Sequence, residues 1–156
     1  KGAYYMGNKK FDVTEFFDYL NERTGTYVLC FDIVGLMRIN DDISREAGDK
    51  VILESLKRIN AAAGKDMPVL RIGGDEFVMV TGLDDVEKVT KIAKAVMEKN
   101  GVQTAYKGGT VPVSIRSGAV MIRKPLKYSM LCHDFDEVIS FARNDGEVHF
   151  AKAEQK

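Results

Sequence analysis

The chain has 156 residues, of which 45% are hydrophobic and 29% charged, which is typical of one globular domain with a hydrophobic core. Its 23 lysine and arginine residues balance 23 aspartate and glutamate residues, so the basic excess of a nucleic-acid-binding protein is absent. No apolar run is long enough to cross a bilayer, no signal peptide is recognisable and the two cysteines are isolated, so we expect a cytoplasmic domain without membrane contact.

The first half of the chain predicts a helix, a buried strand and two further helices, in that order. Apolar residues at helical spacing predict a helix over 12–23, and the uninterrupted β-rich run 27–34 predicts a central strand buried on both faces. A short helix is expected over 37–46. A longer helix then has Asp49 near its start and ends near Gly64, a residue type common after the last turn.

The second half predicts more strands. Residues 68–81 predict a β-hairpin with Gly73-Gly74 at its connection, and Asp84 and Asp85 are candidate caps for the next helix. The remaining expected elements are a pair of strands joined through a glycine turn, a last helix and a short strand, at 102–122, 134–145 and 148–150. This order predicts an α+β fold with a mostly antiparallel central sheet flanked by helices, close to the split βαβ plan.

Asp32 is an exception within its predicted strand, because it is the only charged residue between Tyr27 and Met37. An ionised carboxylate in a buried strand must be paired, hydrogen-bonded or bound to a metal, since an uncompensated buried charge costs several kcal/mol. The alternative is an aspartate at the strand end that reaches solvent or caps the next helix. Both interpretations stay open from this residue alone.

The tip of the predicted hairpin carries a second exception. Two glycines allow a sharp turn and the close approach of a ligand to the backbone, and Asp75 and Glu76 follow them directly. Acidic residues at a turn are usually just solvated. Five specified residues, Gly73 to Phe77, between two apolar arms form a much rarer pattern, and together with Asp32 they favour a functional site.

Four segments together resemble the GGDEF family in their order and spacing. They are Phe31-Asp32-Ile33-Val34, Ile39-Asn40-Asp41, Gly48-Asp49 and Arg71-Ile72-Gly73-Gly74-Asp75-Glu76-Phe77. The resemblance extends from about Tyr27 to the end of the chain. It implies a palm-like fold with a ferredoxin-like βαββαβ core, as in class III nucleotide cyclases and many polymerases. It also implies the condensation of two GTP molecules into cyclic di-GMP, a second messenger in bacterial signal transduction.

The resemblance implies a site with divalent cations, Mg²⁺ or Mn²⁺. Asp32, the Ile33 carbonyl and Asp75 are the implied metal ligands, and hard oxygen ligands are those that Mg²⁺ prefers. Asp32, Asp75 and Glu76 are the implied catalytic residues. Glu76 would assist either at the ribose hydroxyl or at a second metal ion, and the sequence leaves both roles open.

The same resemblance assigns residues to the GTP substrate. Asn40 and Asp49 match the positions that read guanine, although taken alone they are ordinary residues for the start of a helix. The amides of the turn before the second helix are candidates for holding phosphates. The complete implied set for the nucleotide is Gly35, Leu36, Met37, Asn40, Asp49, Gly73, Gly74 and Arg143.

Several positions depart from the family pattern. Val34 replaces a second acidic residue of the first strand, Met37 replaces a lysine, and Glu147 replaces an arginine near the phosphates. The segment 64–67 lacks the arginine of an inhibitory product site, so we expect no feedback inhibition there. These departures leave open a degenerate module that binds GTP without turnover and regulates a neighbouring domain, or a palm-fold domain used only for dimerisation.

The organisation of the parent protein also follows from the resemblance. Each domain would hold one GTP, so catalysis implies a homodimer. The chain starts at Lys1 without methionine, and we expect residues 1–156 to be a single domain from a longer protein. Sensory or effector domains are expected elsewhere in that protein, which could itself be attached to a membrane.

Overall fold

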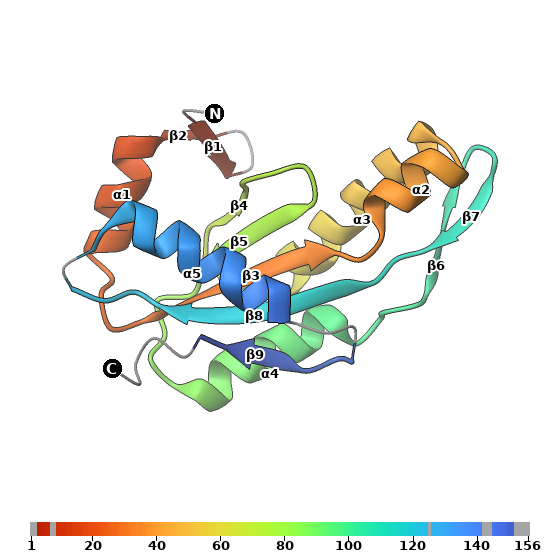
Figure 1. Ribbon diagram of the computed structural model, residues 1–156. Coiled ribbons are helices and arrows are strands. Elements are labelled where there is room, and N and C mark those ends of the chain that lie inside the picture. Colours follow the sequence, from red (N-terminus) through yellow and green to blue (C-terminus); the bar gives the residue numbers. More distant parts are fainter. Residues whose placement is uncertain (1–2, 7–8, 125, 142–144, 152–156) are drawn as a thin grey trace.

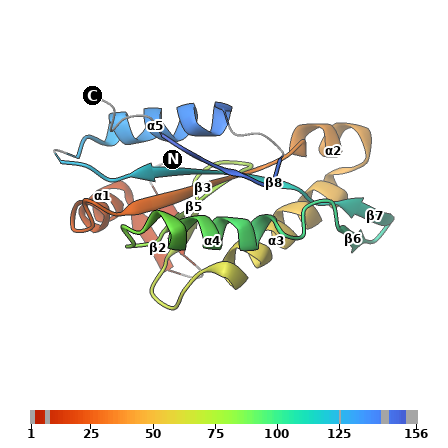
Figure 2. The same cartoon turned by 90° about the horizontal axis from the view of Figure 1, so that it is seen from below.

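The computed structural model describes residues 3–6, 9–124, 126–141 and 145–151 (Figure 1). The elements follow one another in the order β1 (Ala3–Met6), β2 (Lys9–Asp12), α1 (Val13–Asn21), β3 (Tyr27–Ile33), α2 (Leu36–Asp42), α3 (Arg45–Ala62), β4 (Val69–Arg71), β5 (Glu76–Val80), α4 (Val86–Met97), β6 (Gln103–Tyr106), β7 (Gly109–Pro112), β8 (Ile115–Met121), α5 (Tyr128–Phe141) and β9 (Val148–Phe150). The fold is α+β, with helices on both faces of a mostly antiparallel sheet, as the sequence predicts (Figure 2).

The central sheet has the strand order β4-β5-β3-β8-β9. In it, β3 pairs antiparallel with β5 and β8, and β8 pairs parallel with β9. The strands β3, β4, β5 and β8, with α3 and α4 as connecting helices, form the ferredoxin-like βαββαβ core. Every residue of β3 is buried, which confirms the predicted central strand.

Successive side chains of β3 point to opposite layers of the molecule. Leu29, Phe31 and Ile33 pack with residues of α2, α3 and α4, whereas Val28 and Cys30 pack with residues of α1 and α5. Figure 2 shows α5 on one side of the sheet and α3 and α4 on the other. By this alternation, the side chain of Asp32 belongs to the layer that contains α5.

The segment 102–122 differs from the predicted pair of strands. It forms three strands, of which β6 and β7 make a separate two-stranded sheet and β8 joins the central sheet. The glycine turn at Lys107-Gly108 does join β6 to β7. Pro112 has no N–H to donate, and β7 ends at this residue. The apolar run predicts one continuous strand here, whereas the chain leaves the β6–β7 sheet and enters the central sheet. The β6–β7 hairpin extends beyond the central sheet, next to α3 (Figure 1).

Capping residues determine where several of the helices begin. Asp12 and Glu15 form a capping box at α1, and Ser44 caps α3, so the predicted helix 37–46 is divided into α2 and the first residues of α3. Asp85, rather than Asp84, caps α4. The last helix begins at Tyr128, earlier than expected. No helix within the described residues has the length and hydropathy needed to span a bilayer.

The β1–β2 hairpin at the N-terminus was not predicted. Among the described residues its two strands pair only with each other, from Ala3 opposite Asp12 to Met6 opposite Lys9. Each strand has four residues, which is too short for a period-two pattern to be distinguished from a loop.

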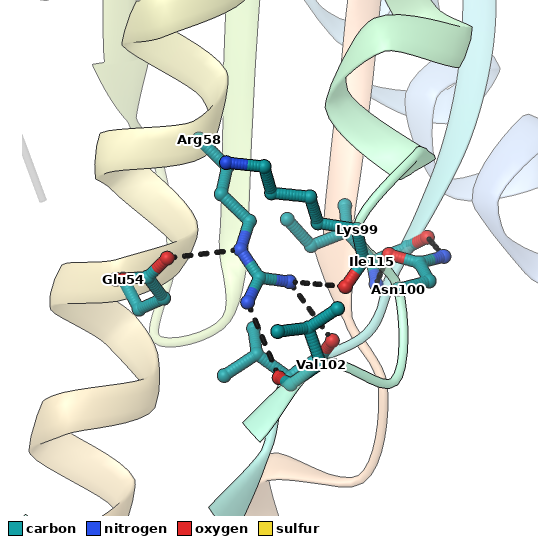
Figure 3. A network of polar contacts seen from close by, with 7 residues as sticks. Glu54, Arg58, Lys99, Asn100, Val102 and Ile115 are labelled. Carbon is teal, nitrogen blue, oxygen red and sulfur yellow. Dashed lines mark hydrogen bonds and ion pairs between the residues drawn. The ribbon is translucent and has the colours of Figure 1, made fainter. Parts of the chain in front are cut away.

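Arg58 of α3 links this helix to the start of β8 (Figure 3). Its side chain is buried and donates hydrogen bonds to the carbonyl oxygens of Lys99 (3.0 Å), Val113 (3.0 Å) and Val102 (3.3 Å), and to a carboxylate oxygen of Glu54 (3.0 Å). Nearly all donors of this guanidinium therefore have a partner. The network fixes the two segments that lead into β6 and into β8 against α3.

Asn100 holds the first residue of β8 in the same region. Its side-chain amide donates to the Ile115 carbonyl oxygen at 2.9 Å and accepts from the Ile115 amide at 3.0 Å (Figure 3). The Asn100 side chain thus forms the two hydrogen bonds that the backbone of a neighbouring strand would form with Ile115. Because Ile115 is fixed, the position of the next residue, Arg116, is fixed as well.

Candidate functional site

Three carboxylates meet where β3 ends and β5 begins. Asp32 lies opposite Glu76 in the antiparallel register, and the Ile33 amide donates to the Asp75 carbonyl oxygen at 2.9 Å. One carboxylate oxygen from each of Asp32, Asp75 and Glu76 lies within 4.8 Å of the other two. The structure therefore brings the strand and the hairpin tip together, and the Ile33 backbone joins the same place.

Burial and mutual repulsion make this cluster electrostatically unfavourable without a cation. Asp32 is only 4% exposed, and burial raises its pKa above the ordinary value, an effect that Arg116 partly offsets and the Asp75 charge increases. Burial also raises the pKa of Glu76, with further contributions from Asp75, Asp32 and Asp136 of α5. The charged forms of both carboxyl groups are therefore disfavoured by their surroundings, and a positive charge at the cluster would relieve this cost.

Arg116 of β8 is the residue at this site that the sequence analysis did not identify. β8 pairs with β3 on the side away from β5, and in this register Arg116 is the partner of Asp32. Its Nε atom donates to Asp32 Oδ2 at 3.1 Å, and its Nη2 atom donates to the same oxygen. The interpretation of Asp32 as a solvent-exposed or helix-capping aspartate is therefore wrong, since the residue is buried and paired and Gly35 precedes α2.

A signal for Arg116 exists in the sequence. It is the only charged residue between Val111 and Ile122, which parallels the argument that singled out Asp32. Two lone charges of opposite sign on two buried strands suggest a pair. The missing information was the register of β8 against β3, which depends on contacts distant in sequence.

Of the two purposes expected for the glycines of the hairpin tip, the structure agrees with the approach to the backbone but not with the sharp turn. Neither Gly73 nor Gly74 has a positive φ, so the turn does not require their backbone freedom. In the part of the chain that the structure describes, no atom lies within 4 Å of the position that a Cβ of Gly74 would take, so the backbone is open to approach at this point. Arg71 donates to the carbonyl oxygens of Gly73 (3.1 Å) and Gly74 (2.7 Å) and braces the tip.

The residues of the turn between β3 and α2 differ in backbone conformation and in the exposure of their side chains. Gly35 has φ 72° and ψ 24°, a left-handed conformation that favours glycine. The side chain of Leu36 is buried in the core, whereas Met37 is 77% exposed. The side chain of Leu36 is therefore not available to a ligand at this turn.

Asn40 and Asp49 lie at adjacent places on α2 and α3. Asn40 Oδ1 is buried and accepts no hydrogen bond within the described residues. It lies against Gly48, where a Cβ would be only 1.7 Å from this oxygen. Asp49 is exposed. The absence of a side chain at Gly48 thus creates the space that holds the Asn40 amide next to Asp49.

Two charged positions that were expected near the phosphates remain, Arg143 and Glu147. Arg143 lies outside the described residues. Glu147 forms an ion pair with Lys94 of α4 at 3.3 Å, and both side chains are more than half exposed. An exposed pair of this kind contributes little to stability.

The comparison with known families decides which group the chain belongs to. The family model described as "Diguanylate cyclase, GGDEF domain" matches residues 14–149. The chain belongs to the GGDEF family. The resemblance read from the motifs is therefore confirmed.

Curated relatives and solved structures agree with this assignment. The chain is 32% identical to the probable diguanylate cyclase DgcI of Escherichia coli over 59% of its length, and 27% identical to diguanylate cyclase DosC of the same organism over 80%. It spans only 20% of DgcI and 28% of DosC. The GGDEF domain of TpbB (YfiN) from Pseudomonas aeruginosa has a TM-score of 0.76 at 23% identity, covering 92% of this chain and 94% of the other.

A second structural neighbour is the GGDEF domain of DgcB from Caulobacter crescentus, in complex with c-di-GMP. It has a TM-score of 0.73 at 19% identity and covers 90% of each chain. At these identities the solved structures establish the shared fold. They confirm that this GGDEF domain has the palm-like architecture that the motifs imply.

The GGDEF family implies a divalent cation, and the donor set of the carboxylate cluster fits one. Carboxylate and carbonyl oxygens are the ligands that Mg²⁺ and Mn²⁺ prefer. Asp32, Asp75 and Glu76 provide them within 4.8 Å, and the unfavourable surroundings of two of these carboxyl groups would be relieved by a cation. The side chain that already compensates Asp32 is Arg116.

Proposed function

We propose that this GGDEF domain is a diguanylate cyclase that condenses two GTP molecules into cyclic di-GMP with Mg²⁺ or Mn²⁺. The observation that carries the proposal is the meeting of Asp32, Asp75 and Glu76 at the end of the central strand. Attack of a 3′-hydroxyl on an α-phosphate needs positive charge at the triphosphate and an activated hydroxyl, and bound divalent cations supply both.

The residues of the chain divide this work between them. Asp32, Asp75 and the Ile33 carbonyl hold the metal, and Glu76 acts at the ribose hydroxyl or at a second metal ion. Asp49 accepts hydrogen bonds from N1–H and the amino group of guanine, and Asn40, whose buried Oδ1 has no partner among the described residues, reads the same base. The backbone at Gly35–Met37 and Gly73–Gly74 approaches the phosphates, and Arg143 binds them through its charge.

Because one domain holds one GTP, product forms only when two copies of the domain face each other. The homodimer is arranged by sensory or effector parts of the parent protein, in a cytoplasmic setting even where that protein is attached to a membrane. A structural neighbour, diguanylate cyclase SiaD from Pseudomonas aeruginosa, has been solved in complex with its activator SiaC, which is a precedent for control of such an enzyme by a partner.

The second candidate is a degenerate domain that binds GTP without turnover and regulates a neighbour. One observation favours it. Arg116 already neutralises Asp32, which weakens the attraction of the site for a metal ion. Glu147, which replaces a cation of the family pattern, is paired with Lys94 of α4, so its negative charge is partly compensated.

The deciding experiment is to incubate the concentrated or artificially dimerised domain with GTP and Mg²⁺ and to measure cyclic di-GMP by chromatography. The expected result is product from the wild-type domain and none from Asp75→Ala. Binding of GTP without product would select the regulatory module. If no GTP binds, the domain serves only for dimerisation and both nucleotide functions are wrong.

Gly48→Ala tests the placement of Asn40. In an ordinary helix position the change would stabilise the helix by about 1 kcal/mol. Here the new Cβ would lie 1.7 Å from Asn40 Oδ1, so the amide must move and lose its contact with guanine. We expect the domain to fold and its affinity for GTP, measured by calorimetric titration, to fall by about tenfold, the equivalent of one hydrogen bond.

The control for this variant is a double substitution. In an Asn40→Ala background, Gly48→Ala should change the affinity for GTP no further, because the clashing amide is gone. An equal loss in both backgrounds would show that Gly48 acts by another route than Asn40.

A further inference from the structure

We infer that Arg116 competes with the divalent cation for Oδ2 of Asp32: its guanidinium neutralises Asp32 in the metal-free domain and must leave Oδ2 before a cation can bind that oxygen. The inference rests on the metal site of the proposed function. It concerns a residue that is not itself a metal ligand, yet determines how tightly the metal is held.

The geometry of the pair shows why the two cations exclude each other. Two donors of the guanidinium, Nε and Nη2, both point to Oδ2 of Asp32. One oxygen that accepts two charge-assisted hydrogen bonds has little capacity left for a metal. A guanidinium and a divalent ion at the same oxygen would also repel each other. Asp32 therefore serves either Arg116 or the metal through this oxygen.

Arg116, rather than Asp32, is the partner that moves. The side chain of Arg116 is 32% exposed, whereas that of Asp32 is 6% exposed at the end of the central strand. The guanidinium can rotate towards solvent without crossing the core, and an arginine is well solvated there. The backbone at Arg116 stays in place, since its neighbour Ile115 is bound by Asn100.

The negative charges of the cluster give Arg116 a role in the metal-free domain. Three carboxylates within 4.8 Å repel one another, and Asp32 is buried. Without metal, Arg116 compensates part of this charge and allows the domain to stay folded. The same compensation lowers the affinity for a divalent cation, so the site fills only at a higher metal concentration than a cluster without the arginine would need.

The test is a titration with Mn²⁺ in the absence of nucleotide, followed by the electron paramagnetic resonance signal of the free ion. Arg116→Gln keeps a polar side chain but removes the charge. We expect it to bind Mn²⁺ at least about tenfold more tightly than the wild-type domain, since metal no longer displaces a charge-assisted pair. Arg116→Lys keeps the charge without the double donation and should lie between the two.

Arg71→Gln is the matched control. It removes one positive charge from the same neighbourhood, but the Arg71 guanidinium donates to the carbonyl oxygens of Gly73 and Gly74 instead of a carboxylate. Its affinity for Mn²⁺ should not rise. An equal gain in Arg71→Gln and Arg116→Gln would mean that only the net charge matters, and the inference would be wrong.

Thermal unfolding gives an independent measurement on the same variants. In a chelator, Arg116→Gln should unfold at a lower temperature than wild type, and Mn²⁺ should raise its unfolding temperature by more. If both proteins bind Mn²⁺ equally, or Arg116→Gln binds it more weakly, the competition does not exist although the metal site does. If neither binds Mn²⁺, the metal site of the proposed function is refuted together with the inference.

Discussion

Asp32→Asn is expected to lower the rate of cyclic di-GMP formation by roughly three orders of magnitude, or about 4 kcal/mol of transition-state stabilisation. Asparagine has the shape of aspartate and can still accept a hydrogen bond from Arg116, so the domain should fold. It lacks the anionic oxygen that a divalent cation needs. The measurement is the initial rate of product formation by the dimerised domain at saturating GTP and Mg²⁺.

Asp42→Asn is the control for this change. Asp42 is an exposed residue at the end of α2, and its replacement removes the same charge from the protein surface. The rate should stay within about twofold of wild type, as for most surface substitutions. An Asp32→Asn variant that keeps a tenth or more of the wild-type rate would contradict the role of Asp32 as a metal ligand.

Arg58→Met should produce the largest loss of stability, about 3 kcal/mol or more in the free energy of unfolding. Methionine fills much of the same volume but donates no hydrogen bond. The carbonyl oxygens of Lys99, Val102 and Val113 and the Glu54 carboxylate would then lose their donor in a largely buried place. Urea denaturation followed by circular dichroism measures this difference.

Arg38→Met provides the comparison for Arg58→Met, because Arg38 is an exposed arginine of α2. Its effect on the free energy of unfolding should be within about 0.5 kcal/mol. Similar small effects of both substitutions would show that the Arg58 network contributes nothing beyond helix propensity. A loss confined to Arg58→Met would confirm that the network connects α3 to the start of β8.

The parts of the fold that the sequence predicts are those with strong local signals. The run 27–33 is apolar without interruption except at Asp32, which identifies a central strand, and the glycine pair between two apolar arms identifies the β4–β5 hairpin. Helices α1 and α4 have a regular apolar face and clear caps. In each case the residues that determine the element are close together in the sequence.

The parts that were missed depend on residues far apart in the sequence. The separation of β6–β7 from β8 is fixed by Arg58 and Asn100, whose partners lie many residues away. The pairing of Arg116 with Asp32 requires the register between β3 and β8. The sequence therefore identified the carboxylates of the site from their motif, but not the cation already beside them.

Because Arg116 lies on one face of β8, the chemistry of the site depends on the number of residues that precede this strand. Ser117, the next residue, is buried among the opposite layer of side chains, because neighbours on a strand alternate. Loss of a single residue ahead of β8, with the strand sliding to close the gap, would bring a hydroxyl opposite Asp32 and turn the guanidinium away. In this protein, a one-codon deletion at this place would thus change metal demand as strongly as a substitution of the arginine itself.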